Sequence, residues 1–239
     1  MTGTWINIGT ILIGSLLGLF FGARLPERVR STVIVALGLF TLAMGMDLFL
    51  KGVQTPGENV LIPLVSLLCG ALLGEWWRLE DRLTAIGAAL EARVVGSSMH
   101  AGSFIRGFVS ASLLFCIGPM TILGSLQDGL TGNYELLAIK AVLDGFAALA
   151  LASTFGVGVI FSTLVVLIYQ GGLSMAAIYF QNTLTEPMLV EMTVVGGILL
   201  LSLAIGTLLE IRQIRTTNLL PALILAPAIV LVLQLLQGF

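Results

Sequence analysis

The sequence predicts an all-α fold, a polytopic membrane helical bundle of about eight transmembrane helices. Three observations support this prediction. Apolar residues make up 57% of the 239 residues and charged residues only 10%, and the mean hydropathy is +1.07. Soluble domains carry about 25% charged residues, so a surface this poor in charge is suited to lipid rather than to water. Third, the apolar residues form runs of about 20, the length of helix that crosses a bilayer.

Taken in order along the chain, the predicted spans are 4–22, 31–50, 60–77, 104–126, 135–153, 156–170, 188–210 and 218–236. The sixth is short, and 172–183 could be a further interfacial or re-entrant piece, so counts of seven and nine are alternatives. Apolar residues recur at helical spacing in 78–100, which predicts an amphipathic helix on the inner membrane surface. The spans together form a single transmembrane domain, 1–239.

The positions of the basic residues favour a count of eight. If the N-terminus lies outside, Lys51 is outside, Lys140 falls within the fifth span, and every arginine is on the inner side. These arginines are Arg24, Arg28, Arg30, Arg78, Arg82, Arg93, Arg106, Arg212 and Arg215. This arrangement satisfies the positive-inside rule. An even number of spans places the C-terminus outside as well.

Small residues recur at every fourth position in two spans, as Gly14, Gly18 and Gly22 and as Gly70 and Gly74. Such stripes let helix backbones approach closely in a membrane, where no hydrophobic effect drives association. We expect them to be packing faces rather than parts of a pore.

A possible inverted repeat is also visible. Residues 41–45 resemble 202–206, and 59–63 resemble 218–221. The second and third spans would then match the seventh and eighth, five spans later, so the copies would have opposite orientations, as in many transporters. Chance is the alternative explanation, because Leu, Ala and Gly are common in any membrane helix.

The first candidate site is a break in the fourth span. Gly118 and Pro119 lie in mid-membrane, and proline both removes a backbone donor and clashes with the preceding turn. Unwound backbone at this depth is tolerated where it lines a wet cavity, and its carbonyls can coordinate cations. Thr121, Ser125 and Gln127 follow the break. The alternative is a simple proline kink.

The second candidate is a charged pair in the fifth span. Lys140 and Asp144 are four residues apart, so they share a helix face and can pair. A lone charge at the bilayer centre costs at least about 2.5–3.5 kcal/mol, and intramembrane ionisable residues are functional candidates by default. Asp128 and Glu135, near the outer end, add oxygen ligands of the kind that hard cations prefer. The alternatives are a structural ion pair and an ordinary solvated loop.

Other functions lack the residues that they need. His100 is the only histidine, and no Ser/His/Asp set can be assembled around it. We therefore expect no enzymatic activity, no cofactor and no metal site. Without a basic tail or arm, we also expect no nucleic-acid partner. The glycine stripes permit a homo-oligomer without requiring one.

At this point the chain resembles a known family, the bacterial YqgA/YdfK-like membrane proteins, numbered DUF554. The resemblance covers essentially the whole chain and rests on the runs 118–132, 143–145, 152–159, 169–171, 211–215 and 218–221 with Lys140. It implies a bacterial inner (cell) membrane protein described only as a possible sodium channel or pump, and it names no substrate.

The functional expectation is therefore a membrane transporter or channel for a small ion, with sodium or a proton as the first candidates. The pathway residues would be Thr121, Ser125, Gln127, Asp128, Glu135, Lys140 and Asp144, beside the break at Gly118 and Pro119. The alternative from another class is a non-transporting membrane scaffold or sensor that acts through partners.

Overall fold

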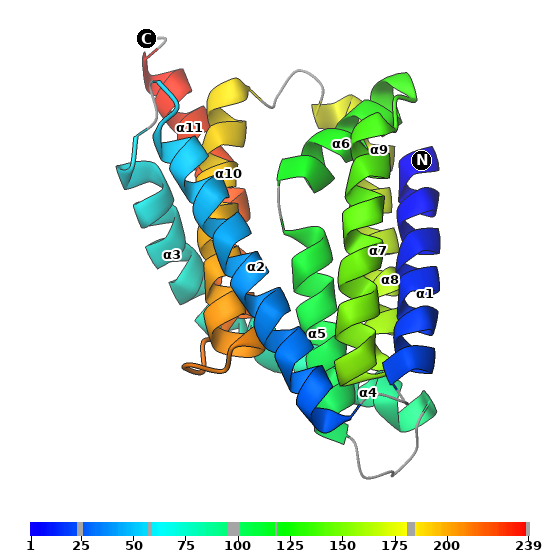
Figure 1. The fold of residues 1–239 in the computed structure, drawn as a ribbon. Coiled ribbons are helices and arrows are strands. Elements are labelled where there is room, and N and C mark those ends of the chain that lie inside the picture. The colour runs from blue at the N-terminus through cyan, green and yellow to red at the C-terminus, as the bar shows by residue number, and fades with distance from the viewer. Residues whose placement is uncertain (23–25, 57–58, 95–100, 118, 181–184, 238–239) are drawn as a thin grey trace.

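The computed structural model describes residues 1–22, 26–56, 59–94, 101–117, 119–180 and 185–237. Within these ranges all regular structure is helical, which confirms the predicted fold class (Figure 1). The elements are α1 (Thr2–Gly22), α2 (Glu27–Val53), α3 (Leu61–Trp77), α4 (Leu79–Val94), α5 (Ala101–Cys116), α6 (Pro119–Thr131), α7 (Glu135–Phe155), α8 (Gly158–Val166), η1 (Leu167–Gly171), α9 (Gly172–Phe180), α10 (Glu186–Leu203), η2 (Ala204–Leu208), η3 (Thr216–Leu219) and α11 (Ala222–Gln237).

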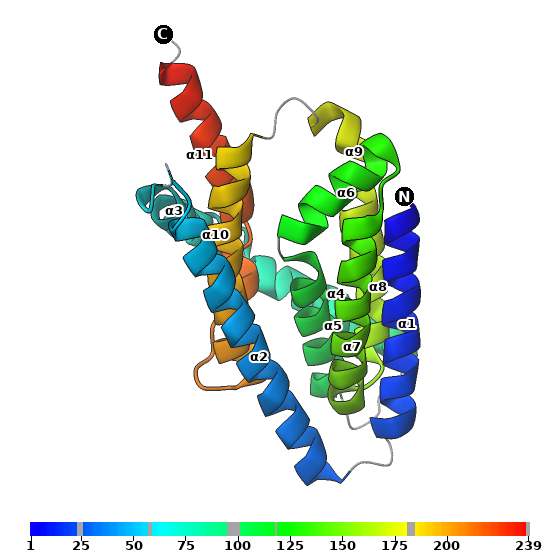
Figure 2. The ribbon, with the colours of Figure 1, turned by 45° about the horizontal axis from the view of Figure 1, so that its top comes forward.

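Six of these helical stretches are long and apolar enough to cross a membrane, and two bent helix pairs raise the number to as many as eight. The bends are 50° between α3 and α4 and 63° between α5 and α6. In Figure 1 the chain runs alternately down and up the bundle, and the start of α1 lies at the same end as the end of α11. Figure 2 shows the same arrangement, which is the one that an even number of crossings produces.

The sixth span is longer than predicted. The helix that begins at Gly158 continues through the π-helical turn η1 into α9 and ends at Phe180, so it passes the expected end at residue 170. A π turn adds a residue to a helix without ending it. The piece expected at 172–183 is thus the continuation of this helix as far as Phe180, and 181–184 lie outside the described residues.

The expected surface helix after the third span corresponds to α4, while 95–100 lie outside the described residues. Arg78, between α3 and α4, has a left-handed backbone with φ 52°. This conformation ends α3 and lets α4 leave at an angle. The arginine-bearing segments come together here: Arg106 of α5 pairs with Glu210, and Arg215 pairs with Glu75 of α3.

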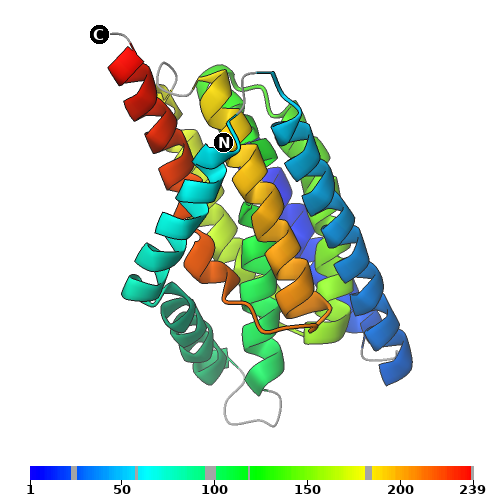
Figure 3. The ribbon, with the colours of Figure 1, turned by 90° about the vertical axis from the view of Figure 1, so that its left-hand side faces the viewer.

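The helices form two groups (Figure 1). In one group α2 packs against α10 and α3 packs against α11, and Figure 3 shows this group in front. In the other, α7 packs against α1, α5 against α8, and α6 against α9. The groups meet where α2 contacts α7 and α10 contacts α5 and α6.

The two segments that resemble each other in sequence lie in the same group. The chain runs up α2 and down α10, and down α3 and up α11, so the two copies are antiparallel (Figure 1). A side chain at Gly45 would meet the Gly197 carbonyl oxygen at 2.8 Å, and one at Gly197 would meet the Gly45 carbonyl oxygen at 2.7 Å. The antiparallel orientation is the one that an inverted repeat would have, and the repeat itself stays a prediction.

The first glycine stripe forms the contact between α1 and α7. A Cβ atom at Gly14 would lie 2.1 Å from the Gly145 carbonyl oxygen, and one at Gly18 would lie 2.3 Å from that of Leu149. A Cβ atom at Gly22 would lie 2.5 Å from the Ser153 carbonyl oxygen. These glycines bring the two backbones together, which is the packing role expected from the sequence.

We expect Gly14→Ala to destabilise the bundle by about 1–3 kcal/mol, because the new methyl group would overlap backbone rather than a flexible side chain. Unfolding in mixed detergent micelles would measure the change. Gly9→Ala is the matched control, since Gly9 is on the same helix and a Cβ there meets nothing within 4 Å. Equal stability of the two variants would contradict the packing role.

The outer surface is apolar along most of the bundle. Large hydrophobic side chains such as Leu72, Ile168 and Ile224 are 73–76% exposed, and Phe146 is 71% exposed. Polar side chains including Asn7 and Gln170 are meanwhile fully buried. This distribution is that of a protein whose outer surface faces lipid.

Candidate functional site

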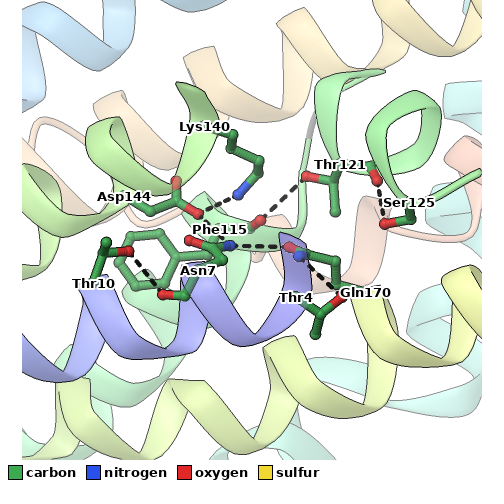
Figure 4. Close-up of polar contacts among 9 residues, drawn as sticks. All are labelled: Thr4, Asn7, Thr10, Phe115, Thr121, Ser125, Lys140, Asp144 and Gln170. Carbon is green, nitrogen blue, oxygen red and sulfur yellow. Dashed lines mark hydrogen bonds and ion pairs between the residues drawn. The ribbon is translucent and has the colours of Figure 1, made fainter. Parts of the chain in front are cut away.

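The centre of the candidate site is a buried ion pair on α7. Lys140 and Asp144 are one helical turn apart, and the Lys140 ammonium pairs with Oδ2 of Asp144 (Figure 4). Lys140 is 6% exposed and Asp144 is 7% exposed. The structure therefore brings this predicted pair together and turns it into the bundle.

The carboxylate is bonded to an amide side chain of α1, which in turn is bonded to an amide side chain of η1. Asn7 of α1 donates from Nδ2 to Asp144 Oδ2 at 3.0 Å and to Gln170 Oε1 at 2.9 Å. Gln170 lies in the π-helical turn η1 and donates in turn to the Thr4 hydroxyl at 3.3 Å. Asn7, Thr4 and Gln170 are all fully buried. The ion pair is thus one end of a polar chain that joins α7, α1 and η1 (Figure 4).

One atom of this chain has no partner in the described part of the protein. The side-chain oxygen of Asn7, Oδ1, is buried without a hydrogen bond. Leaving such a group unpaired costs about 1–3 kcal/mol. An ordered water or a cation beside Asn7 would satisfy it.

The helix break lies beside the pair, since Ile117 and Thr121 share a cavity with Lys140 and Asp144. Helix α5 ends at Cys116 and α6 begins at Pro119 at an angle of 63°, while Gly118 is outside the described residues. The Thr121 hydroxyl donates to the Phe115 carbonyl oxygen at 3.3 Å, and the Ser125 hydroxyl donates to the Thr121 carbonyl oxygen at 2.5 Å. The Thr121 bond therefore bridges the break, whereas the Ser125 bond lies within α6.

A cavity of about 540 Å³ lies between the two helix groups, against the ion pair. It is lined by Leu37, Phe40, Thr41, Met44 and Leu48 of α2, by Leu114, Ile117, Met120 and Thr121 around the break, by Lys140, Leu143, Asp144, Phe146 and Ala147 of α7, and by Leu200 of α10. The charged pair and the first turn of α6 thus share one cavity at the junction between the groups.

Asp128 has a different position from the one expected. Its side chain is fully buried and accepts hydrogen bonds from the backbone amides of Thr2 and Gly3, both at 3.1 Å. The Met1 amino group lies 3.2 Å from Oδ1. Asp128 of α6 therefore caps the N-terminus of α1, where the helix dipole favours a carboxylate, and it does not line the cavity.

Gln127 and Glu135 are exposed and do not line the cavity either. The backbone N–H of Glu135, the first residue of α7, donates to Oδ1 of Asn133 at 3.0 Å. Of the residues predicted for the pathway, only Thr121, Lys140 and Asp144 meet at the cavity. Among the described residues, no group of three or more His, Cys, Asp or Glu side chains could hold a metal ion.

Sequence reasoning did not include Thr4, Asn7 and Gln170 in the site. The signal for two of them was present, because Asn7 and Gln170 are amide side chains within otherwise apolar spans. Amides in membrane helices tend to hydrogen-bond across helices. That they converge on Asp144 follows only from the packing of α1 and η1 against α7.

We expect Asp128→Ala to loosen the first turn of α1 and to destabilise the protein by about 0.5–2 kcal/mol, the usual value of a helix cap. Hydrogen–deuterium exchange of the first ten residues would show faster exchange. Asp47→Ala is the control, because Asp47 is an exposed aspartate that pairs with Lys51 at 2.7 Å and caps no helix of the described residues. If Asp128→Ala loses ion flux while the first ten residues exchange as slowly as in the unmodified protein, the capping role is contradicted. Asp128 would then belong to the ion pathway, as the sequence predicted.

The sequence comparisons place this arrangement in a family. A family model described as "Protein of unknown function (DUF554)" matches residues 2–231. The chain is 31% identical over 234 residues to "Uncharacterized membrane protein YdfK" of Bacillus subtilis (strain 168), covering 98% of this chain and 97% of that protein. It is 33% identical over 226 residues to "Uncharacterized protein YqgA" of Escherichia coli (strain K12), covering 94% of each. No solved structure matches the chain. With its apolar helices and these relatives, the chain is a membrane protein that belongs to the DUF554 family.

Proposed function

We propose that the protein is a membrane transporter or channel for a small ion, sodium or a proton, and that Lys140 and Asp144 form the centre of its pathway. One observation supports this above all: a buried ion pair lines a cavity between two helix groups, beside a broken helix. Transporters commonly place their sites in this way, near discontinuous helices and between the parts that move.

Stability alone is a weak reason for placing these two charges there. A buried ion pair is often no more stabilising than apolar residues of similar volume. A group that exchanges protons or cations, in contrast, has to be ionisable and has to adjoin a cavity. Ionisable residues inside a membrane are for this reason functional candidates.

The division into two groups supports transport by rocking. The cavity walls come from α2 and α10 on one side and from α5, α6 and α7 on the other. A rotation of one group against the other would open the cavity to alternate sides of the membrane. The arginine-bearing segments would face the cytoplasm of the bacterial cell under the positive-inside rule, with both termini extracytoplasmic.

The test is a flux assay on the purified full chain in liposomes. Sodium, potassium, proton and chloride gradients are imposed one at a time, and the flux is compared with that of protein-free liposomes. The proposal requires flux of at least one cation above that background. A folded protein with no flux of any of these ions would favour the scaffold or sensor instead.

A further inference from the structure

We propose that the cavity binds an organic anion with an apolar body, one proton being taken up by Asp144 as the anion binds to Lys140. This inference rests on the proposed function, because it assigns a substrate class to the same cavity. The anionic group would lie between the Lys140 ammonium and the first turn of α6, and the apolar body would lie against α2 and α7.

The size and lining of the cavity suit an organic molecule. Its volume of about 540 Å³ falls within the range of about 300–1,000 Å³ that is typical of small-molecule pockets. Eleven of its fifteen lining residues are apolar, and the polar ones are Thr41, Thr121, Lys140 and Asp144. A bare ion needs neither this volume nor these walls, so the small ion of the proposed function would here be the proton that accompanies the organic anion. A mainly apolar wall with a few convergent polar groups is the usual form of a site for an amphiphilic ligand.

The cavity also has an apolar edge on the outer surface. Phe40 of α2 and Phe146 of α7 both line it and are 60% and 71% exposed. In a membrane, these side chains face lipid at the seam between the two helix groups. A molecule with an apolar body, already dissolved in the bilayer, could therefore reach the cavity from the side.

Among the groups that line the cavity, Lys140 supplies the charged donor that an anion needs. In the described part of the chain, Asp144 Oδ2 is the only partner of the Lys140 ammonium, which leaves donors for a ligand. The same Oδ2 already accepts from both Lys140 and Asn7. Met120 and Thr121, in the first turn of α6, line the cavity, and the first amides of a helix lack partners within it and attract anions. At the opposite side of the break, the Phe115 carbonyl is already bonded to Thr121.

Charge balance requires the proton. The Lys140–Asp144 pair is neutral as a unit, and adding an anion alone would leave a net charge in a low-dielectric site at high cost. Protonation of an Asp144 carboxylate oxygen keeps the site neutral, and the bound anion replaces that carboxylate as the partner of Lys140. The only covalent change is a proton transfer, in which an O–H bond forms on Asp144 as the bond of that proton to a hydronium ion or buffer acid of the solution breaks.

The other groups near Asp144 do not carry a competing charge. Asn7 of α1 and Gln170 of η1 are neutral amides, and α2 contributes Thr41 to the cavity wall. Among the described residues, the ionisable neighbours besides Lys140 are the Cys116 thiol of α5 and, next to it, the Tyr169 hydroxyl of η1. Asp144 is thus the group in this surrounding that can accept the balancing proton.

The experiment measures binding of 2-naphthalenesulfonate to the full chain in lipid nanodiscs. A sulfonate stays ionised at the working pH, so it brings no proton of its own. Proton uptake is followed with an indicator dye in weak buffer, and we expect close to one proton per bound anion. The cationic arm uses naphthylmethyl-trimethylammonium, which has a similar ring and a fixed positive charge.

Three variants separate the parts of the proposal. Lys140→Met should weaken binding by about tenfold or more, since it removes a charged hydrogen-bond donor. Met44→Trp should also weaken sulfonate binding, because the larger side chain fills the cavity while both charges stay in place. This variant tests the binding site even if Lys140→Met fails to fold. Asp144→Asn should bind the anion without proton uptake, because it resembles the protonated acid. Lys51→Met and Asp47→Asn alter the exposed pair of α2 and should change nothing.

Three results would overturn this inference. One is a wild-type protein that does not bind the sulfonate although it shows Asp144-dependent small-ion flux; the proposed function then stands. A second is sulfonate binding that is unchanged in Lys140→Met and Met44→Trp, which places the ligand elsewhere. The third is binding of the ammonium probe with proton release. If the protein instead binds the anion with the expected proton uptake but shows no flux of any ion, the proposed transport function fails and the proposed binding site stands.

Discussion

Replacing Asp144 by asparagine is expected to reduce ion flux in liposomes to the level of protein-free vesicles. The substitution keeps the shape of the side chain and an oxygen that can accept from Asn7, which lies 3.0 Å from Oδ2. It removes the negative charge and the ability to exchange a proton. The Lys140 ammonium loses its charged partner, so the variant should be less stable, but the preserved shape should let it fold while the pathway loses its ionisable acceptor.

The matched control is Asp47→Asn. Asp47 and Lys51 form an i,i+4 pair like that of Asp144 and Lys140, but on the exposed end of α2. The control should transport like the unmodified protein, with each variant reconstituted at the same density and checked for a monodisperse elution profile. Normal flux through Asp144→Asn would refute the functional role of the buried pair.

Replacing Lys140 by methionine is expected to destabilise the protein by about 3 kcal/mol or more. Removing one partner of a buried pair leaves the other charge uncompensated, and such losses run to about 3–5 kcal/mol. The Asp144 carboxylate would keep only its hydrogen bond to Asn7 among the described residues. Adding Asp144→Asn to Lys140→Met removes that charge, so the double variant should recover most of the lost stability.

Unfolding of the two single variants and of the double variant in mixed micelles completes a double-mutant cycle. Lys51→Met is the control, and its loss should be below about 1 kcal/mol, the value of an exposed pair. A double variant no more stable than Lys140→Met would show that the charges do not compensate each other in the folded protein.

Much of the architecture could be predicted from local sequence alone. The length of each apolar run decides whether a helix can cross the bilayer, and this is a property of a single segment. The interruption of the fourth span likewise follows from the chemistry of Pro119, where α6 begins. Spacing along one helix was enough to pair Lys140 with Asp144. The length of the sixth span was underestimated because its helix continues through a π turn that holds a buried Gln170.

The composition of the site, in contrast, depended on which helices pack together. In a membrane, lipid-facing and packed faces are about equally apolar, so hydropathy does not reveal which faces meet. Asp128 and Asp144 look alike in the sequence, yet one caps α1 and the other lines the cavity. The difference arises because the glycine stripe of α1 seats that helix directly against the α7 backbone. The sequence by itself therefore determined the spans, the break and the ion pair, whereas the tertiary packing decided that Asn7 and Gln170 would meet Asp144 and that a cavity would remain between the two helix groups.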